Sequence, residues 1–462
     1  MNTPSDPLPS RRAFLQRAAG GLALPPLARL LGDGDGALVR HHTPRAKAVV
    51  FLYMDGGPSP QDLFDYKPRL VAEHGKPFGM TMEPTQFGDN GSTLGPVAKF
   101  AQHGESGQWI SDLLPHIATE ADKLCVVRSV TAEFSEHTNA NYFLHTGHGL
   151  QGRPSFGAWI GHGLGRDCRD LPAFVVLNGG LIPPGGVDCF HSGFLPAHAQ
   201  GSVFGLRGPM VGNIAPREDR AERQARKVAL SRMLDAASRD HFGADPAIDA
   251  AIANRELAFR MQRAVPDLAD LSGESPRLQA AYGLDDDCEQ TRIFGRQCLL
   301  ARRLVERGVR FVELLCPKNG HDRWDQHSNL EDGLRDNCRM VDRPIATLLA
   351  DLHARGLLDE TIVLWGGEFG RTPFAQGSTG RDHNPFGFTM WLAGGGFRPG
   401  TSYGATDDYG YKAVQDPVSV HDLHATILWQ LGIDHERFTY RWGGRDLRLT
   451  DVFGKVVRGL LA

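Results

Sequence analysis

The chain has 462 residues, which is enough for up to three average domains or for one large α/β domain. Hydrophobic residues make up 41% and charged residues 23%, and 50 basic against 54 acidic side chains give a formal net charge of -4. These ordinary globular values exclude a disordered chain, a coiled coil and a membrane bundle. Because no long run of basic residues occurs, we expect no nucleic-acid partner.

Glycine, proline and cysteine narrow the choice of structure further. The 55 glycines and 29 prolines predict long, shaped loops without reaching the level of a low-complexity chain. Seven cysteines are present, and none is spaced as CxxC. This number and spacing indicate neither a zinc ribbon nor a complete disulfide framework.

The first 40 residues are predicted to be a signal region. Residues 10–15 (SRRAFL) have the pattern of a twin-arginine export signal, and an uncharged stretch follows at residues 18–28. Pro25 and Pro26 interrupt this stretch, which is much shorter than the roughly 20 apolar residues of a membrane span. We therefore expect export to the periplasm or another extracytoplasmic space, without a transmembrane anchor. The alternative is a disordered N-terminus with a chance arginine pair.

Strand and helix patterns alternate along the rest of the chain. Long helices with a period near 3.6 residues are expected across residues 220–307. Further helices are expected at residues 110–121, at residues 330–355 with a kink at Pro344, and at residues 420–431 after the capping residue Ser419. Short apolar runs predict strands at residues 48–54, 124–130, 174–177, 309–315, 362–365 and 388–393.

This alternation predicts an α/β fold around a parallel or mixed sheet. No internal repeat and no Gly/Ser-rich linker is visible in the sequence. We therefore expect residues 41–462 to form a single domain, with a helical insertion at about residues 217–307.

Acidic and imidazole side chains gather next to the predicted strands. In an α/β sheet, ligands bind beyond the carboxyl ends of the strands. Carboxylate oxygen and imidazole nitrogen are ligands that zinc and similar divalent ions accept. The sequence therefore predicts a metal site at one edge of the sheet. The candidate residues in these loops are Asp55, His321, Asp322, Asp325, His327, Glu368, Asp382 and His383.

Structural roles are the alternatives for these residues. Asp55 could accept hydrogen bonds from the amides of its own Gly-Gly-Pro turn, and Asp325 could pair with a nearby arginine at a solvated helix entry. A buried Glu368 needs a partner, either a metal or Arg371. His383 by itself would be a structural histidine. His421 and His424 lie in a regular amphipathic pattern, so we interpret both as structural.

Two other chemistries lack support in the sequence. Residues 147–152 (GHGLQG) match GxGxxG by letters, but no convincing strand leads into them, so a dinucleotide site is not expected. Neither a Walker loop nor a GxSxG elbow occurs.

Several long strings in the chain resemble one bacterial family. The strings are MDGGPSPQDLFDYKP, LARRLVERGVRFVEL, WDQHS, LLDETIVLWGGEFGRTP, GRDHNPFGFTMWLAGGGF, YGATDDYGY and VHDLHATILWQLGIDHERFTYRWGGRDLRLTDV. With them, the chain resembles the exported family called domain of unknown function 1501. That family is similar to the alkaline phosphatase and sulfatase superfamily. The resemblance implies a central mixed, mostly parallel sheet with helices on both faces.

The resemblance also implies roles for individual residues. Asp55, Asp325, His327, Glu368 and His383 would be the metal ligands, with Phe369 standing where a second ligand of that strand end is expected. His137 lies near the place of the nucleophile, and Thr138 is one residue away. The Cys-x-Pro-x-Arg maturation motif of sulfatases does not occur.

We therefore expect an exported metal-dependent hydrolase of sulfate or phosphate esters. Its cofactor would be a divalent ion, zinc ahead of calcium or magnesium, and its substrate a small-molecule or polysaccharide ester. In this hypothesis His137 is the general acid or base, Thr138 is a possible nucleophile, and Arg371 binds the oxyanion. The alternative is a catalytically degenerate metal-binding or structural protein of the same fold.

Overall fold

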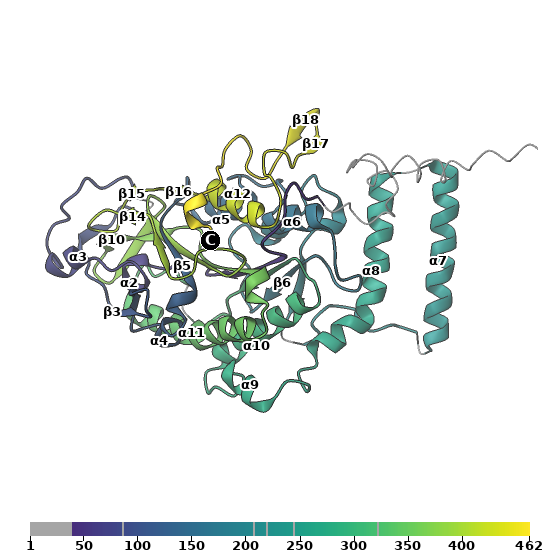
Figure 1. Ribbon diagram of the computed structural model, residues 1–462, viewed down its shortest axis with the longest axis horizontal. Helices are drawn as coiled ribbons and strands as arrows, with labels where there is room; N and C mark the ends of the chain where they lie inside the picture. The colour runs from purple at the N-terminus through teal and green to yellow at the C-terminus, as the bar shows by residue number, and fades with distance from the viewer. Residues whose placement is uncertain (1–38, 86, 207, 219, 244, 321–322) are drawn as a thin grey trace, which may run out of the picture.

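The computed structural model describes residues 39–85, 87–206, 208–218, 220–243, 245–320 and 323–462. The predicted signal sequence, together with His321 and Asp322, lies outside these residues. Figure 1 shows the arrangement of the elements. The helices are α2 (Pro60–Leu63), α3 (Pro68–Ala72), α4 (Pro115–Ala118), α5 (His137–Thr146), α6 (Phe156–Leu164), α7 (Ala221–Phe242), α8 (Pro246–Ala269), α9 (Pro276–Ala281), α10 (Glu289–Glu306), α11 (Leu330–Ala354) and α12 (Val420–Gln430).

Within the described residues, the main sheet has nine strands in the order β13-β5-β12-β9-β1-β8-β6-β7, with β16 beside β5. All pairings in it are parallel except those of β12 with β5 and β9. Its strands are β1 (Ala48–Tyr53), β5 (Leu124–Thr131), β6 (Phe174–Asn178), β7 (Ser202–Gly205), β8 (Phe311–Leu315), β9 (Thr361–Gly366), β12 (Phe388–Ala393), β13 (Thr401–Tyr403) and β16 (Val418–Ser419).

Smaller sheets border this one. The order β11-β10-β2 is formed by β11 (Gly380–Asn384), β10 (Gly370–Gln376) and β2 (Asn90–Thr93). The remaining pairs are β3 (Phe100–His103) with β4 (Gln108–Ser111), β14 (Ala405–Thr406) with β15 (Ala413–Gln415), and β17 (Tyr440–Trp442) with β18 (Arg445–Leu447).

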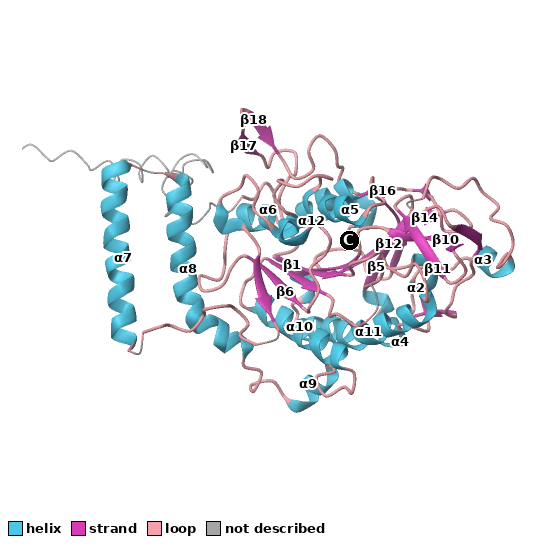
Figure 2. Cartoon of the chain, turned by 180° about the vertical axis from the view of Figure 1, so that it is seen from behind, coloured by secondary structure: helices cyan, strands magenta, loops and turns pink. Residues whose placement is uncertain are grey.

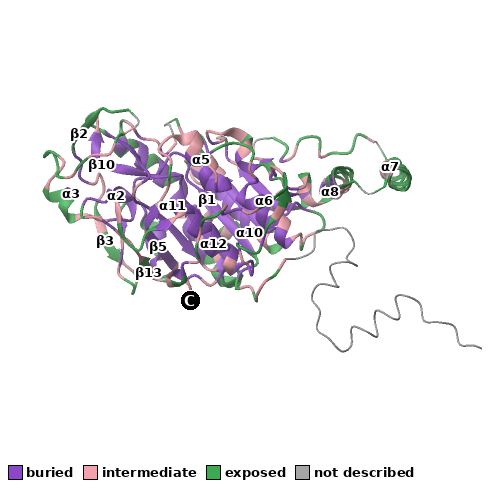
Figure 3. Ribbon diagram, turned by 90° about the horizontal axis from the view of Figure 1, so that it is seen from above, coloured by how far each residue is buried: buried purple, intermediate pink, exposed green. Residues whose placement is uncertain are grey.

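Helices cover both faces of the main sheet, as Figure 2 shows. The alternation of side chains along β1 explains this, since Val50 and Leu52 pack into the core beneath α10 and α11. On the other face, Val49 and Phe51 pack into the core beneath α5, α6 and α12. A strand covered on both sides needs a continuous apolar run, which residues 48–53 supply. Figure 3 shows the buried interior that results. The predicted fold class, an α/β fold with a mixed, mostly parallel sheet and helices on both faces, is confirmed.

Most of the predicted elements are present, with two corrections. Residues 110–121 are not one helix, because β4 ends at Ser111 and only two short turns follow, α4 and a 3-10 helix at Ala121–Lys123. His383 is not in a loop but in strand β11, which pairs with β10. The sequence of β11, GRDHN, has no apolar alternation to mark it as a strand. Pro344 lies inside α11, and the predicted kink there stays a prediction.

The seven cysteines are all free thiols. Among the described residues, no helix combines the length and the apolar character that crossing a bilayer requires.

Candidate metal centre

The sheet topology brings the predicted loops to one edge. Strands β1, β8 and β9 are parallel neighbours, so the loops that follow them leave at the same edge. Strand β12 is antiparallel to β9, and therefore its first residue lies at this edge as well. Segments near residues 55, 325, 368 and 384 meet there although they are far apart in the sequence.

Four side chains form a cluster at this edge. One ligand atom from each of His137, Asp325, His327 and His383 lies within 4.8 Å of all the others. His137 is the first residue of α5, and His383 is in β11. Asp325 is in the centre: its Oδ2 is 3.0 Å from His137 Nε2, and its Oδ1 is 2.9 Å from His327 Nε2 and 3.2 Å from His383 Nε2.

The outer nitrogen of each histidine is anchored. Nδ1 of His383 lies 2.6 Å from the carbonyl oxygen of Ser135, and Nδ1 of His137 lies 2.7 Å from Glu368 Oε1. Nδ1 of His327 bonds the side-chain oxygen of Gln376. Partners of this kind fix the ring orientation and leave Nε2 to face inward, as in protein metal sites.

The inward-facing nitrogens fit a metal ion. A carbonyl oxygen only accepts hydrogen bonds, so His383 carries its proton on Nδ1 and presents a lone pair on Nε2. Within the described residues, Nε2 of His137 and Nε2 of His327 are buried, and each lies within 3.0 Å of an Asp325 oxygen without the alignment of a hydrogen bond. A cation among these nitrogens and the Asp325 carboxylate would give each of them a ligand contact.

Charges around the cluster set its protonation. Although burial opposes ionisation, Arg371 and the neighbouring histidines hold the pKa of Asp325 below its usual range. Burial lowers the pKa of His383 to about 4, so its imidazole is neutral at pH 7. For His137 burial acts in the same direction, but contacts with Asp325 and Glu368 outweigh it and raise the pKa to about 10. Without a cation, His137 is therefore an imidazolium between two carboxylates.

Glu368 lies behind this cluster. Its carboxylate is completely buried. It accepts hydrogen bonds from the backbone amide of Gly56, at 3.0 Å, and from the hydroxyl of Tyr53, at 3.0 Å. Burial would raise the pKa of Glu368, but the hydrogen bond and charge of His137 lower it. Glu368 is thus an ionised partner of His137.

Asp55 lies beside Glu368 and pairs with Arg323. Its Oδ2 is 2.5 Å from Arg323 Nε, and its Oδ1 is 3.5 Å from the hydroxyl of Tyr53. Burial and then repulsion from Glu368 raise the pKa of Asp55 to about 7. The amide of Gly56, which the alternative interpretation gave to Asp55, donates to Glu368 instead.

A comparison with protein-family models identifies the family of the chain. A model of the family described as protein of unknown function (DUF1501) matches residues 46–461. The chain belongs to this family. The resemblance found in the sequence is thereby confirmed. Among curated proteins, no sequence matches the chain.

Several solved structures are similar to this DUF1501 chain. A sulfatase from Pseudoalteromonas sp. is 13% identical over 90% of this chain and 72% of its own, with a TM-score of 0.38. An alkaline phosphatase from the Antarctic bacterium TAB5 is 8% identical over 84% of this chain and 98% of its own, with a TM-score of 0.33. A phosphonate monoester hydrolase from Silicibacter pomeroyi is 13% identical over 69% of this chain and 68% of its own, with a TM-score of 0.34. Likeness at this level carries no argument about activity.

Three of the five residues predicted as metal ligands lie in the four-residue cluster, and two lie outside it. Asp325, His327 and His383 lie in the four-residue cluster. Asp55 and Glu368 lie at the same edge, outside the cluster. The sequence placed His137 here as an acid or base, and the structure adds its Nε2 to the cluster. It also adds Arg323 as the partner of Asp55 and Gln376 as the partner of His327. No sequence signal marks Gln376.

The two remaining candidates make contacts with the protein itself. Arg371 is 1% exposed and donates to the carbonyl oxygens of Gly56, Gly57 and Arg381 and to Asp325 Oδ1. Thr138 helps to lower the pKa of Glu136 and is not one of the four cluster residues.

Phe369 forms an apolar wall of the cluster. Its ring stacks on the ring of His383, with centroids 4.4 Å apart and an interplanar angle of 28°. The ring of His137 is also near it, at 5.0 Å. Phe369 therefore fills space beside the histidines without offering a ligand.

Proposed function

We propose that this DUF1501 protein is a metal-dependent hydrolase of sulfate or phosphate esters. The observation that supports this most is the convergence of His137, Asp325, His327 and His383, each of which has a ligand atom within 4.8 Å of those of the others. Three imidazole nitrogens and one carboxylate oxygen are ligands that zinc accepts, and zinc can take a fifth ligand during catalysis. Calcium and magnesium prefer sites built from oxygen alone, so zinc is the proposed ion.

A divalent ion in this position supplies Lewis-acid stabilisation of charge on a sulfuryl or phosphoryl oxygen. The chain's own residues prepare the site. Arg371, with donors directed at three carbonyl oxygens and at Asp325, holds the carboxylate of Asp325 in place. Glu368 orients the ring of His137 through its Nδ1. The ring of Phe369 keeps water away from one side of the four-residue cluster. Charges interact more strongly where water is excluded.

His137 is proposed to bind the metal through Nε2 and to keep one proton on Nδ1. Its imidazole touches both carboxylates, Asp325 through Nε2 and Glu368 through Nδ1, so proton exchange in the metal-loaded site is limited to the Glu368 side. With a metal in place His137 must give up its Nε2 proton, and Glu368 then holds the remaining proton on Nδ1. The role of His137 as a general acid or base, expected from the sequence, stays a prediction.

The oxyanion role predicted for Arg371 and the nucleophile role of Thr138 also stay predictions. The contacts of Arg371 favour its positioning role. The absence of Thr138 from the four-residue cluster favours water as the attacking group. Asp55 and Glu368, proposed as ligands from the sequence, are assigned here to the support of the site.

The experiment is an assay of the purified chain on 4-nitrophenyl sulfate and 4-nitrophenyl phosphate, with and without added zinc. We expect zinc-dependent turnover that falls at least about 100-fold in His383→Ala and His327→Ala, since each removes a ligand. His353→Ala is the matched control, because His353 is exposed on α11. Turnover that survives both ligand variants would contradict the proposal.

A non-catalytic metal-binding protein is the second candidate. It is favoured by Arg323, which pairs with Asp55, and by Phe369, which offers no ligand where the family resemblance expects one. One bound zinc together with no turnover of either ester would support this candidate over the hydrolase.

The proposed substrates include esters of polysaccharides. We also propose export by the twin-arginine route, which is supported by the SRRAFL sequence of residues 10–15. Changing Arg11 and Arg12 to Lys together should leave the protein in the cytoplasmic fraction. Equal export of the wild type and the double variant would contradict this route.

A further inference from the structure

Helix α7 stands apart from the body of the molecule. Figures 1 and 2 show α7 and α8 side by side at one end, with α7 outermost. Figure 3 shows α7 as almost entirely exposed. None of the α7 side chains that the structure describes is buried. A helix of 22 residues normally owes its stability in a protein to an apolar face packed against something.

Polar contacts hold α7 to α8. Arg232 pairs with Glu256 at 2.6 Å and Arg239 with Asp249 at 2.6 Å, and Asp235 pairs with Arg255. Exposed ion pairs of this kind contribute little to stability.

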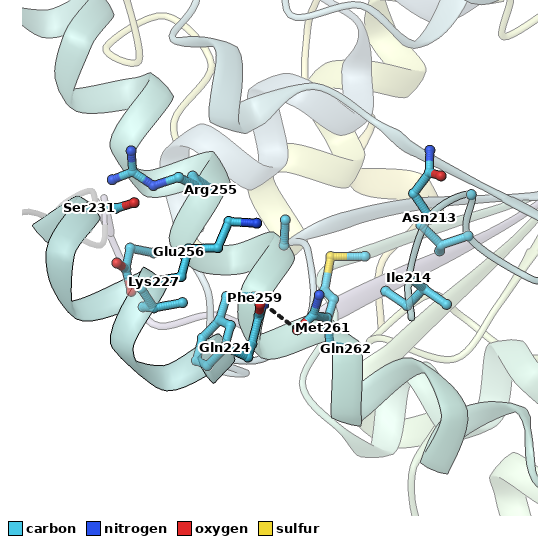
Figure 4. A pocket seen from close by; sticks show the side chains of 14 residues that line it. Asn213, Ile214, Gln224, Lys227, Ser231, Arg255, Glu256, Phe259, Met261 and Gln262 are labelled. Carbon is cyan, nitrogen blue, oxygen red and sulfur yellow. Dashed lines mark hydrogen bonds between the residues drawn. The ribbon is translucent and has the colours of Figure 1, made fainter. Parts of the chain in front are cut away.

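The packing between the two helices is loose. A cavity of about 250 Å³ lies between them, lined among others by Val228, Phe259 and Met261 (Figure 4). The hydrogen bond between Gln224 and Gln262, 3.2 Å long, crosses it. The inner face of α7 is therefore incompletely packed against α8.

The outer face of α7 carries an apolar stripe. Leu230 is 57% exposed, Met233 69% and Leu234 63%. The series Arg226, Leu230, Met233, Ala237 and Asp240 has alternating spacings of four and three residues. This is the heptad spacing of a helix that packs against another helix.

The two ends of the stripe carry opposite charges. Arg226 lies seven residues before Met233, and Asp240 lies seven residues after it. Among the described side chains, neither Arg226 nor Asp240 has an oppositely charged partner within 4.0 Å. A second α7 packed antiparallel across Met233 would place each Arg226 against the Asp240 of the other copy. A parallel arrangement would place like charges together.

We propose that two copies of this chain associate through the outer faces of α7, packed antiparallel around a twofold axis near Met233. Such an interface is isologous, because the same patch is used on both copies. Since α7 is the outermost element (Figure 3), the two bodies lie on opposite sides of the helix pair. The apolar stripe is then covered, and both charge pairs are satisfied.

The test measures the dissociation constant of the full chain by sedimentation equilibrium, with a charge-exchange series. We expect a reversible dimer. Arg226→Glu alters both symmetric charge pairs and should weaken the dimer about tenfold, and Asp240→Arg should do the same. The double variant Arg226→Glu with Asp240→Arg restores opposite charges and should recover most of the affinity.

The controls separate association from folding. Arg445→Glu makes the same change of charge at a distant exposed site and should leave the dimer unchanged. Far-UV circular dichroism checks that α7 remains helical in every variant. A chain that is monomeric at every concentration would overturn the proposal, as would a double variant as weak as the single ones.

Discussion

At the scale of single residues, a buried ion pair lies behind the four-residue cluster. His145 of α5 and Glu313 of β8 are 3% and 1% exposed, and His145 Nε2 lies 2.8 Å from Glu313 Oε1. Burial disfavours the imidazolium, but the charge and hydrogen bond of Glu313 outweigh it and raise the pKa of His145. This pair ties α5, whose first residue is His137, to the central sheet.

Replacing Glu313 with Ala should be strongly destabilising. The variant leaves a buried imidazole without its carboxylate, so we expect the free energy of unfolding to fall by about 3–5 kcal/mol. Urea denaturation followed by tryptophan fluorescence measures this. The matched control is Glu331→Ala, which breaks an exposed pair with Arg335 and should cost less than about 1 kcal/mol. Equal effects of the two variants would contradict the role given to the buried pair.

His424 should make the protein sensitive to acid. Burial, and then the charge of His421, lower the pKa of His424 to about 3, whereas an unfolded histidine has a pKa of about 6.5. Between these values the unfolded chain binds a proton that the folded chain does not. Stability is therefore lost as the pH falls from about 6.5 towards 3, by about 1.4 kcal/mol per unit.

The variant His424→Gln tests this. Glutamine can keep the donor that His424 Nε2 offers to the carbonyl oxygen of Leu144, and it does not titrate. The drop in melting temperature between pH 7 and pH 4.5 should become smaller in His424→Gln and stay unchanged in the exposed His353→Gln. The same drop in all three proteins would contradict the assignment.

At the scale of elements, strand β11 connects the small sheet to the four-residue cluster. Its His383 pairs across the strands with Arg371 of β10, so one hairpin positions both side chains. Gly380 begins β11, and a Cβ atom there would overlap the carbonyl oxygen of His327. This close approach keeps the loop of Asp325 and His327 against the strand that carries His383.

Gly380→Ala should therefore impair the proposed metal centre without removing any proposed ligand. We expect at least about tenfold weaker zinc binding, because the backbone at His327 must move and metal sites tolerate little displacement of their ligands. Isothermal titration calorimetry measures the affinity. Gly212→Ala is the control, since a Cβ atom at Gly212 meets open space. Unchanged zinc affinity in Gly380→Ala would contradict this account.

The elements also show how far the sequence alone could lead. The apolar runs of β1, β8, β9 and β12 were predictable because both faces of the main sheet are covered. The small sheet was not, since β11 is a polar strand in which Arg381 is buried through its pair with Asp62, 2.8 Å away. Buried polar partners of this kind leave no periodic pattern in the sequence.

At the scale of the whole molecule, the topology decides which predicted residues meet. Placing Asp55, Asp325 and Glu368 at one edge followed from the rule for the carboxyl ends of strands. The sequence could not show that His137 joins Asp325, or that Arg371 pairs with Asp325 instead of Glu368. Those contacts depend on side-chain orientation across elements more than 40 residues apart.

The most direct test of the central claim is the zinc content of the purified chain, measured by inductively coupled plasma mass spectrometry after dialysis. The four-residue cluster predicts about one zinc per chain in the wild type and in His353→Ala. It predicts less than about a tenth of that in His327→Ala and in His383→Ala. A wild-type chain that retains no metal after zinc loading, or ligand variants that retain as much as the wild type, would contradict the claim.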